Sequence, residues 1–293
     1  MTAPRRYRSS EEDSDRWRRF PFREGDVVVS TRSKSGTTWV QQICLSLVHG
    51  SPALPAPLGQ LSPWVDWLTE PEEVLFSRLD AQPGRRVVKT HTPLDGVVID
   101  PRAAYVVVVR DPLDMAVSLY HQGDNLDRQR IAELTGRTAS APSPRPPLSD
   151  WLVRWTTDEA DPMLSMDSLA GVVHHAADAW ARADGERVLV VRYEGLVADL
   201  EGQMRWLADR LGSCSTRRFG RRSLPERPLP ACEPRPPNGR RVIAACSRTL
   251  PPSSGAAPQG RVARSLRWRT WPPTSGRCAT CSPPRRSTTR LGC

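Results

Sequence analysis

The sequence predicts an α/β fold, a parallel sheet flanked by helices, over residues 21–212, and two patterns carry this prediction. Four short runs rich in Val recur along the chain, and continuous apolar residues are typical of strands covered on both faces. Segments with apolar residues at helical spacing separate these runs, which is the alternation expected of a parallel sheet. The expected strands are Asp26–Thr31, Arg86–Thr90, Ala104–Arg110 and Arg187–Arg192. The expected helices are Thr38–Val48, Pro112–His121, Val172–Ala183 and Val197–Leu211.

The composition of the chain changes near Gly212. Residues 213–293 hold 17 Arg, 2 Glu and 13 of the 29 Pro, with no Lys or Asp, so their net charge is +15. The first 212 residues therefore carry −5, although the whole chain of 293 residues carries +10. Because Pro at this frequency breaks helices and strands, we expect 213–293 to be a basic tail of low order. Residues 1–20 are almost wholly polar and charged, and we expect them to form a disordered arm.

The expected location is the cytoplasm, with no membrane partner. The sequence contains no run of roughly 18 apolar residues, the length that a membrane helix needs. Its first residues carry charges where a signal peptide needs an apolar segment. The basic tail suggests nucleic acid, but it lacks Lys and has few aromatic residues to stack on bases, so a nucleic-acid partner is disfavoured. No pattern in the sequence indicates an oligomeric state.

The first expected strand runs directly into a turn of small and hydroxyl residues, followed by a helix. Backbone N–H groups and the helix dipole converge at such a turn, which favours binding of an anion. The candidate residues are Lys34, Ser35, Gly36, Thr37, Thr38 and Trp39. The turn is P-loop-like, but its Lys precedes its Gly, and without the G-x-x-x-x-G-K-[ST] spacing nucleoside triphosphate hydrolysis is disfavoured. A plainer interpretation is a polar helix cap, in which Thr37 or Thr38 satisfies free N–H groups.

Lysine is rare in this chain, which draws attention to the positions where it occurs. Only Lys34 and Lys89 are lysines among the 42 Lys and Arg residues, and both lie beside hydroxyl residues at the end of an expected strand or just after one. An ammonium group releases its proton more readily than guanidinium, which is a reason to need Lys here. Lys89 begins K-T-H-T-P at the carboxyl end of a strand, where ligands bind in open α/β sheets. His91 in this segment is a candidate general base, and the alternative is a polar surface residue.

Two further candidate sites follow the third and fourth expected strands. Arg110 ends a strand and Ser118 lies on the next helix, so both are candidates to hold a phosphate, with bidentate contact from Arg. The alternative is a surface pairing of Arg110 with Asp111 and no role for Ser118. Tyr193, in R-Y-E-G-L, is either a ligand contact or an aromatic cap on the strand end.

Together these segments resemble the cytosolic-type sulfotransferase family, which moves a sulfuryl group from 3′-phosphoadenosine 5′-phosphosulfate (PAPS) to an acceptor. The resemblance covers about residues 21–212. S-K-S-G-T-T-W is similar to the family's P-K-S-G-T-T-W loop, and K-T-H-T-P to its K-T-H-L-P. V-V-R-D-P-L-D-M-A-V-S is similar to its R-N-P-K-D-x-x-V-S, and R-Y-E-G-L to its Y-E-D segment. Four matches in the same order at strand ends are specific together, although each alone is weak.

The resemblance implies a binding role for most of the candidate residues. The group that would hold the 5′-phosphosulfate comprises Lys34, Ser35, Gly36, Thr37 and Thr38. Trp39 would flank the adenine, and Tyr193 would lie near the base. Arg110 and Ser118 would bind the 3′-phosphate.

The resemblance also implies the chemistry, which requires no metal. His91 would take the proton of a hydroxyl or amine on a small-molecule acceptor, and Lys89 would steady the sulfuryl oxygens. Lys34 would stabilise the charge that grows on the leaving phosphate oxygen, an interaction that acts mainly in the transition state.

Two departures from the family pattern change these expectations. Arg32 and Ser33 replace the usual aromatic-Pro pair before Lys34, and the loss of a fixed backbone angle is expected to loosen the turn. The late R-K-G-x-x-G-D-W loop, which closes over the 3′-phosphate, is not found in 213–293. Its absence makes a catalytically defective sulfotransferase-like product the first alternative function, and a kinase-like P-loop protein the second.

Four interpretations of the tail compete. It is a basic arm for nucleic acid, a zinc site at Cys278 and Cys281, a disulfide framework, or the translation of a GC-rich gene in the wrong frame. A lone C-x-x-C is a weak zinc signal, and disulfides conflict with an intracellular enzyme. We favour the frameshift, because one reading of Pro252–Gly260 two bases later gives V-F-R-R-G-T-S-G, close to the missing loop.

Overall fold

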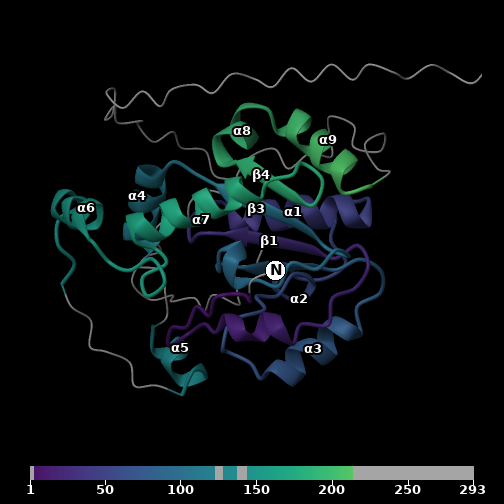
Figure 1. Ribbon diagram of the computed structural model, residues 1–293, viewed down its shortest axis with the longest axis horizontal. Coiled ribbons are helices and arrows are strands. Elements are labelled where there is room, and N and C mark those ends of the chain that lie inside the picture. Colours follow the sequence, from purple (N-terminus) through teal and green to yellow (C-terminus); the bar gives the residue numbers. More distant parts are fainter. Residues whose placement is uncertain (1–2, 123–127, 137–143, 214–293) are drawn as a thin grey trace, which may run out of the picture. The chain divides into compact units, whose positions relative to one another are not determined.

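The predicted α/β fold is confirmed by a computed structural model, which describes residues 3–122, 128–136 and 144–213. In this part of the chain a single sheet of four parallel strands has the order β2-β1-β3-β4. The strands are β1 (Val27–Thr31), β2 (Val87–Thr90), β3 (Ala104–Val109) and β4 (Val188–Arg192). Each begins and ends within one residue of its expected position. Figure 1 shows β4, β3 and β1 side by side, with helices along them.

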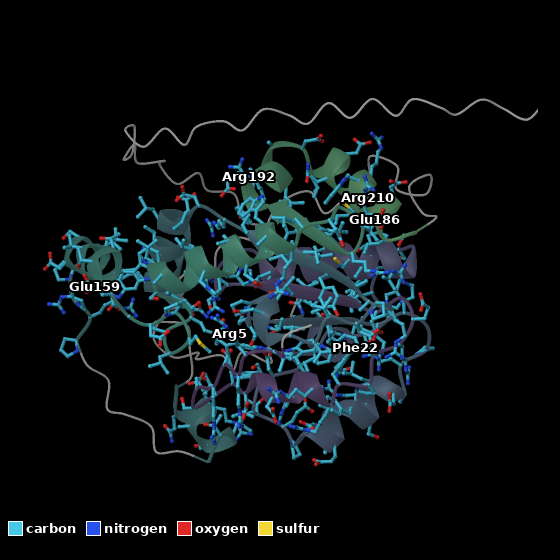
Figure 2. All side chains as sticks on the ribbon, viewed as in Figure 1. Arg5, Phe22, Glu159, Glu186, Arg192 and Arg210 are labelled. Atoms are coloured by element: carbon cyan, nitrogen blue, oxygen red, sulfur yellow. The ribbon has the colours of Figure 1, made fainter. Side chains whose placement is uncertain are left out.

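The strand register brings all four carboxyl ends to one edge of the sheet. Val27 of β1 pairs with Val87 and with Ala104, and Tyr105 pairs with Val188. Figure 2 makes the two edges visible, because Phe22 and Glu186, which precede β1 and β4, lie toward the same side of the view. Arg192, the last residue of β4, lies on the other side. Segments that follow the strands are therefore neighbours in space.

Helices cover both faces of the sheet, because successive side chains of a strand point to opposite faces. Val27 and Val29 pack into the first core with helices on one face, and Val28 packs into the second core on the other. The first face carries α1 (Thr37–His49), α8 (Tyr193–Ala198) and α9 (Leu200–Arg210). The second carries the 3₁₀ turn η1 (Ser14–Arg18), α3 (Glu72–Asp80) and α7 (Leu169–Arg182). Strands buried on both sides explain the continuous Val runs.

A third, smaller core lies away from the sheet. It joins Met115 of α4 (Pro112–Gln122), Trp155 of α6 (Leu148–Thr157) and Val172 of α7. The remaining short elements are α2 (Leu58–Leu61), α5 (Arg128–Leu134) and the 3₁₀ turn η2 (Leu94–Gly96).

The helices differ from the expected ones in several places, and α2, α3 and α6 were not predicted. The helix expected at Val197–Leu211 is two helices, because Asp199 leaves helical geometry and its carboxylate caps α9 by accepting from the N–H of Gly202 at 2.9 Å. The polar segment 122–150, where the sequence predicts no helix, contains α5 and the start of α6. Ile131 and Ala132 are buried there, an apolar pair too short to give a periodic signal.

The expectation of a disordered arm at residues 1–20 is wrong for the described residues 3–20. Tyr7 and Trp17 are 0% and 1% exposed, and the Trp17 ring lies 5.1 Å from Phe20 and 6.0 Å from Phe22. A few large aromatic side chains bury enough apolar area to hold a segment that is otherwise charged. Several of its charges remain at the surface in pairs such as Arg19 with Glu72.

The expected tail, with Cys278 and Cys281, lies outside the described residues except for Ser213. The chain divides into the units Met1–Thr249 and Leu250–Cys293, and all described residues belong to the first. Among the helices of the described ranges, none is long and apolar enough to cross a membrane.

Candidate active site

The turn between β1 and α1 has the backbone geometry of an anion cradle. Gly36 precedes the helix with φ 93°, in the left-handed region, and no side chain among the described residues caps the start of the helix. Thr37 instead places its Oγ1 2.5 Å from Oγ1 of Thr31, so the polar helix cap considered for Thr37 or Thr38 is not formed. Lys34 also has a positive φ, 62°, which is costly for a residue with a side chain. Within the described ranges the first-turn N–H groups of α1 therefore have no side-chain cap, which is the state that binds an anion.

Five of the predicted nucleotide-binding residues lie in contact with one another beside this turn. The Arg110 guanidinium donates to the Lys34 carbonyl oxygen at 2.7 Å and lies 4.4 Å from the centre of the Tyr193 ring. Tyr193 makes an edge contact with Trp39, at 5.7 Å between ring centres. A Cβ on Gly36 would lie 2.7 Å from Cδ2 of Tyr193. The turn between β1 and α1 (the phosphate turn, after its predicted role), the end of β3 and the start of α8 are thus in direct contact.

Three other predicted residues lie apart from this cluster or turn away from it. Ser35 is 2% exposed, and its N–H closes the turn by donating to the Arg32 carbonyl oxygen at 3.2 Å. Thr38 is exposed in the first turn of α1. Ser118 is half-buried on α4, and within the described ranges no hydrogen bond joins it to Arg110.

His91 is held as a neutral imidazole whose Nε2 has no hydrogen-bond partner among the described residues. Its Nδ1 lies 2.5 Å from the Thr31 carbonyl oxygen, and because a carbonyl only accepts, Nδ1 carries the proton and Nε2 keeps a lone pair. Burial, followed by the positive charges of Lys89 and Arg32, lowers the pKa of His91 to about 3. The edge-on Trp64 ring, 4.4 Å away, restricts the imidazole further. The side chain therefore has the protonation state that a general base needs at neutral pH.

Lys89 lies one residue before the end of β2, on the same edge. Its Nζ lies 4.3 Å from the centre of the Trp64 ring, a cation–π contact. Burial lowers the pKa of Lys89 to about 8, and the carboxylates of Glu12 and Asp66 offset part of this effect. The ammonium is charged at neutral pH and loses its proton as the pH rises through about 8.

Sequence reasoning missed the acidic residues around these bases. Asp66 is fully buried, and its Oδ2 accepts from the hydroxyls of Thr90 and Thr92, each at 2.6 Å. Glu12 comes from the N-terminal segment, and burial followed by the Asp66 charge raises its pKa to about 8. Neither residue belongs to a motif, and both reach the site through tertiary packing alone. The one usable signal is the aromatic sequence Trp64–Trp67 around Asp66, which is unusual in a polar loop.

The loosened turn expected from Arg32 and Ser33 is also not found. Arg32 is 3% exposed and donates to the His91 carbonyl oxygen and, at 2.8 Å, to Oδ1 of Asp167. The Ser33 N–H donates to the same Oδ1 at 3.3 Å. The turn is anchored by hydrogen bonds where the family pattern uses a proline ring. Within the described ranges, no group of three His, Cys, Asp or Glu side chains is arranged to hold a metal ion.

Comparison with known proteins identifies the family. Residues 24–220 match the sulfotransferase domain, and the chain belongs to this family. A glycolipid sulfotransferase of Mycobacterium bovis (strain BCG / Pasteur 1173P2) is 38% identical over 72% of this chain and 70% of its own length. Glycolipid sulfotransferase Rv1373 of Mycobacterium tuberculosis (strain ATCC 25618 / H37Rv) is 36% identical over the same shares. The prediction that this chain is a PAPS-dependent sulfotransferase is confirmed, and the kinase-like alternative is set aside.

A solved structure is similar as well. It is retinol dehydratase in a complex with retinol and PAP, with a TM-score of 0.47 and 20% identity. The match covers 69% of this chain and 66% of that protein.

Proposed function

We propose that this sulfotransferase moves the sulfuryl group of PAPS to a hydroxyl or amine of a small-molecule acceptor, with His91 as the general base. The observation that carries the proposal is the bond from Nδ1 of His91 to the Thr31 carbonyl oxygen, which leaves Nε2 unprotonated. His91 follows β2 and the phosphate turn follows β1, so the adjacent strands bring base and turn to one edge of the sheet. The acceptor O–H would give its proton to Nε2 as its oxygen bonds to sulfur, while the bond from sulfur to the 5′-phosphate oxygen breaks.

The other roles are those that the family resemblance implies, and charge and position are consistent with them. The N–H groups at the start of α1, with Lys34, Ser35, Gly36, Thr37 and Thr38, hold the 5′-phosphosulfate in this proposal. The uncapped helix end supports that assignment. Lys34 stabilises charge on the leaving oxygen, and Lys89 stabilises the sulfuryl oxygens.

The nucleotide end of the donor is assigned to the cluster beside the turn. Arg110 binds the 3′-phosphate with Ser118, and Tyr193 and Trp39 contact the base. The aromatic edge contact and the stacking of Arg110 on Tyr193 support a preorganised nucleotide site. Of these assignments the contacts support Ser118 least, since no hydrogen bond joins it to the cluster within the described ranges.

The acceptor class is part of the proposal. The mycobacterial relatives are named glycolipid sulfotransferases, so a sugar hydroxyl of a glycolipid is the first acceptor to test. We also propose a cytoplasmic location, which the absence of a roughly 18-residue apolar run in the sequence supports and cell fractionation tests.

Calorimetric binding of 3′-phosphoadenosine 5′-phosphate (PAP), compared with adenosine 5′-phosphate, tests the donor site. We expect PAP to bind more tightly and Arg110→Ala to weaken PAP by roughly ten- to a hundredfold, the loss of one charge-assisted contact. The control is Arg102→Ala, because Arg102 precedes the same strand at the opposite edge and its exposed side chain pairs with Asp100. Equal affinity for the two nucleotides would refute the 3′-phosphate assignment.

Turnover with a glycolipid acceptor, followed by mass spectrometry of the sulfated product, tests the base. We expect His91→Ala to lower turnover by roughly 10²- to 10⁴-fold while PAP affinity is retained. Unchanged turnover in this variant would remove His91 from the mechanism. A folded wild-type chain that binds PAP but gives no product would favour the catalytically defective alternative.

A further inference from the structure

The arginine at position 32 lies in a buried environment that disfavours a charge. Arg32 directly follows β1, and its side chain is 3% exposed. A buried guanidinium is costly unless it is paired and hydrogen-bonded. An apolar ring would have avoided this cost, so the contacts that compensate it are informative.

The guanidinium links three segments that are far apart in the sequence. One terminal nitrogen donates to the His91 carbonyl oxygen, in the segment that follows β2. The other donates to Oδ1 of Asp167 at 2.8 Å, just before α7. Asp167 is itself fixed, since its Oδ1 accepts from the Ser33 N–H and its carbonyl oxygen accepts from Nε1 of Trp155 at 2.8 Å.

His91 is thereby held from two sides by consecutive residues of one strand end. Thr31 accepts from Nδ1 of the ring, and Arg32 donates to the main-chain carbonyl of the same residue. The direction of Nε2 is therefore set relative to the turn that carries Lys34. A shift of about 1 Å between reacting groups costs on the order of a hundredfold in rate, so such a brace has a kinetic consequence.

We infer that Arg32, held by Asp167, is a positioning residue that sets His91 relative to the phosphate turn. The inference rests on the proposed role of His91. Arg32 touches neither donor nor acceptor in this scheme and acts through the backbone of His91. Asp167 supplies the negative charge opposite the buried Arg32 guanidinium, and its own side chain is 35% exposed.

The test uses the full chain with Arg32→Met, Arg32→Lys and Asp167→Asn. The asparagine retains an Oδ1 that accepts from the Ser33 N–H, so the turn stays anchored while the charge is lost. We expect kcat to fall by about ten- to a hundredfold in Arg32→Met and less in Asp167→Asn. PAP affinity and the KM for PAPS should change by less than about threefold, and Arg32→Lys should recover part of kcat.

A spectroscopic readout separates positioning from general loss of structure. The ¹⁵N shifts of the His91 imidazole, assigned by comparison with His91→Asn, report which nitrogen carries the proton. We expect Nδ1 to be protonated in the wild-type chain and a mixture of tautomers in Arg32→Met. Asp167→Asn remains informative if Arg32→Met does not fold.

The outcomes separate this inference from the proposed function. Equal turnover of His91→Ala and the wild-type chain would refute the role of His91. If His91→Ala loses turnover but both Arg32 variants keep the wild-type kcat, the role of His91 stands and the positioning role of Arg32 is refuted. Parallel losses of kcat and PAP affinity would also refute it, because Arg32 would then serve only the turn.

Discussion

The two edges of the sheet each hold an Arg–Asp pair, and the pairs differ in a way that separates stability from chemistry. At the amino edge, Arg86 and Asp26 are both 0% exposed and joined by two hydrogen bonds, of 2.9 and 2.6 Å. At the carboxyl edge, Arg32 and Asp167 are joined by one bond of 2.8 Å, and Nε of Arg32 is buried without a partner within the described residues. The first pair is saturated, while the second leaves bonding capacity unused.

Register explains why the saturated pair forms. Asp26 and Arg86 immediately precede β1 and β2, and pairing of Val27 with Val87 places them side by side. Arg86 also donates to the Pro21 carbonyl oxygen at 2.7 Å. At the carboxyl edge the strands are followed by turns of different length, and not all of their buried polar groups form hydrogen bonds within the described residues. The comparison teaches that the strands fix one edge and leave the other free for ligand chemistry.

Breaking the saturated pair should give the largest effect on stability. Arg86→Met leaves the Asp26 carboxylate buried without its partner, and we expect a loss of about 3–5 kcal/mol in the free energy of unfolding. Urea denaturation followed by circular dichroism measures this. Arg102→Ala, which removes an exposed pair with Asp100, should cost at most about 1 kcal/mol. Similar losses in both variants would contradict the contrast drawn here.

Gly36→Ala tests the carboxyl edge by a smaller change. The left-handed φ of 93° and the contact of 2.7 Å with the Tyr193 ring should cost about 1–3 kcal/mol of stability, and displacing Tyr193 should weaken PAP by about tenfold or more. Gly84→Ala is the matched control, because Gly84 has φ 71° with no atom within 4 Å of the added Cβ. Gly84→Ala should lower the free energy of unfolding without changing the affinity for PAP. Retained PAP affinity in Gly36→Ala would show that the ring is not part of the nucleotide site.

Glu12→Gln should give an effect that depends on pH, small near pH 5 and larger as the pH rises toward 8. The pKa of Glu12 is raised to about 8 in the folded chain. Between its ordinary value near 4.3 and about 8, the unfolded chain ionises while the folded chain keeps the proton, so stability falls as the pH rises. In this window the free energy of unfolding of Glu12→Gln, relative to that of the wild-type chain, should rise by at most about 1.4 kcal/mol per pH unit. Denaturation at pH 5 and pH 8 measures the gain, with Glu11→Gln as control, and a difference independent of pH would contradict it.

The sequence predicted the strands and the location of the candidate site for one physical reason. Strands buried on both faces must be apolar throughout, so their ends are sharp, and parallel topology then gathers the residues that follow them. Lys34, His91, Arg110 and Tyr193 were predicted in this way, since each follows a strand.

The residues that were missed depend on contacts between distant segments. Asp167 lies in a loop before α7, and nothing near it in the sequence indicates Arg32 as its partner. Glu12 lies in a charged segment whose buried aromatic residues have no regular spacing. Arg32 was noticed as a departure from a motif, but its effect on the turn could not be judged without Asp167. Motifs therefore predicted the side chains assigned to chemistry. The side chains that hold and surround them come together only through tertiary packing.

The strand order also governs how this chain acquires its shape during synthesis. β1 lies inside the sheet between β2 and β3, and β3 pairs with β4, so every pairing joins segments separated by a helix and loops. Loop closure must precede each contact, which makes such a topology slow to fold. Until β4 leaves the ribosome, the Val-rich strand β3 has an unpaired edge. The nascent chain therefore passes through a period in which it is prone to aggregation, and we expect its yield to improve with slower expression or added chaperones.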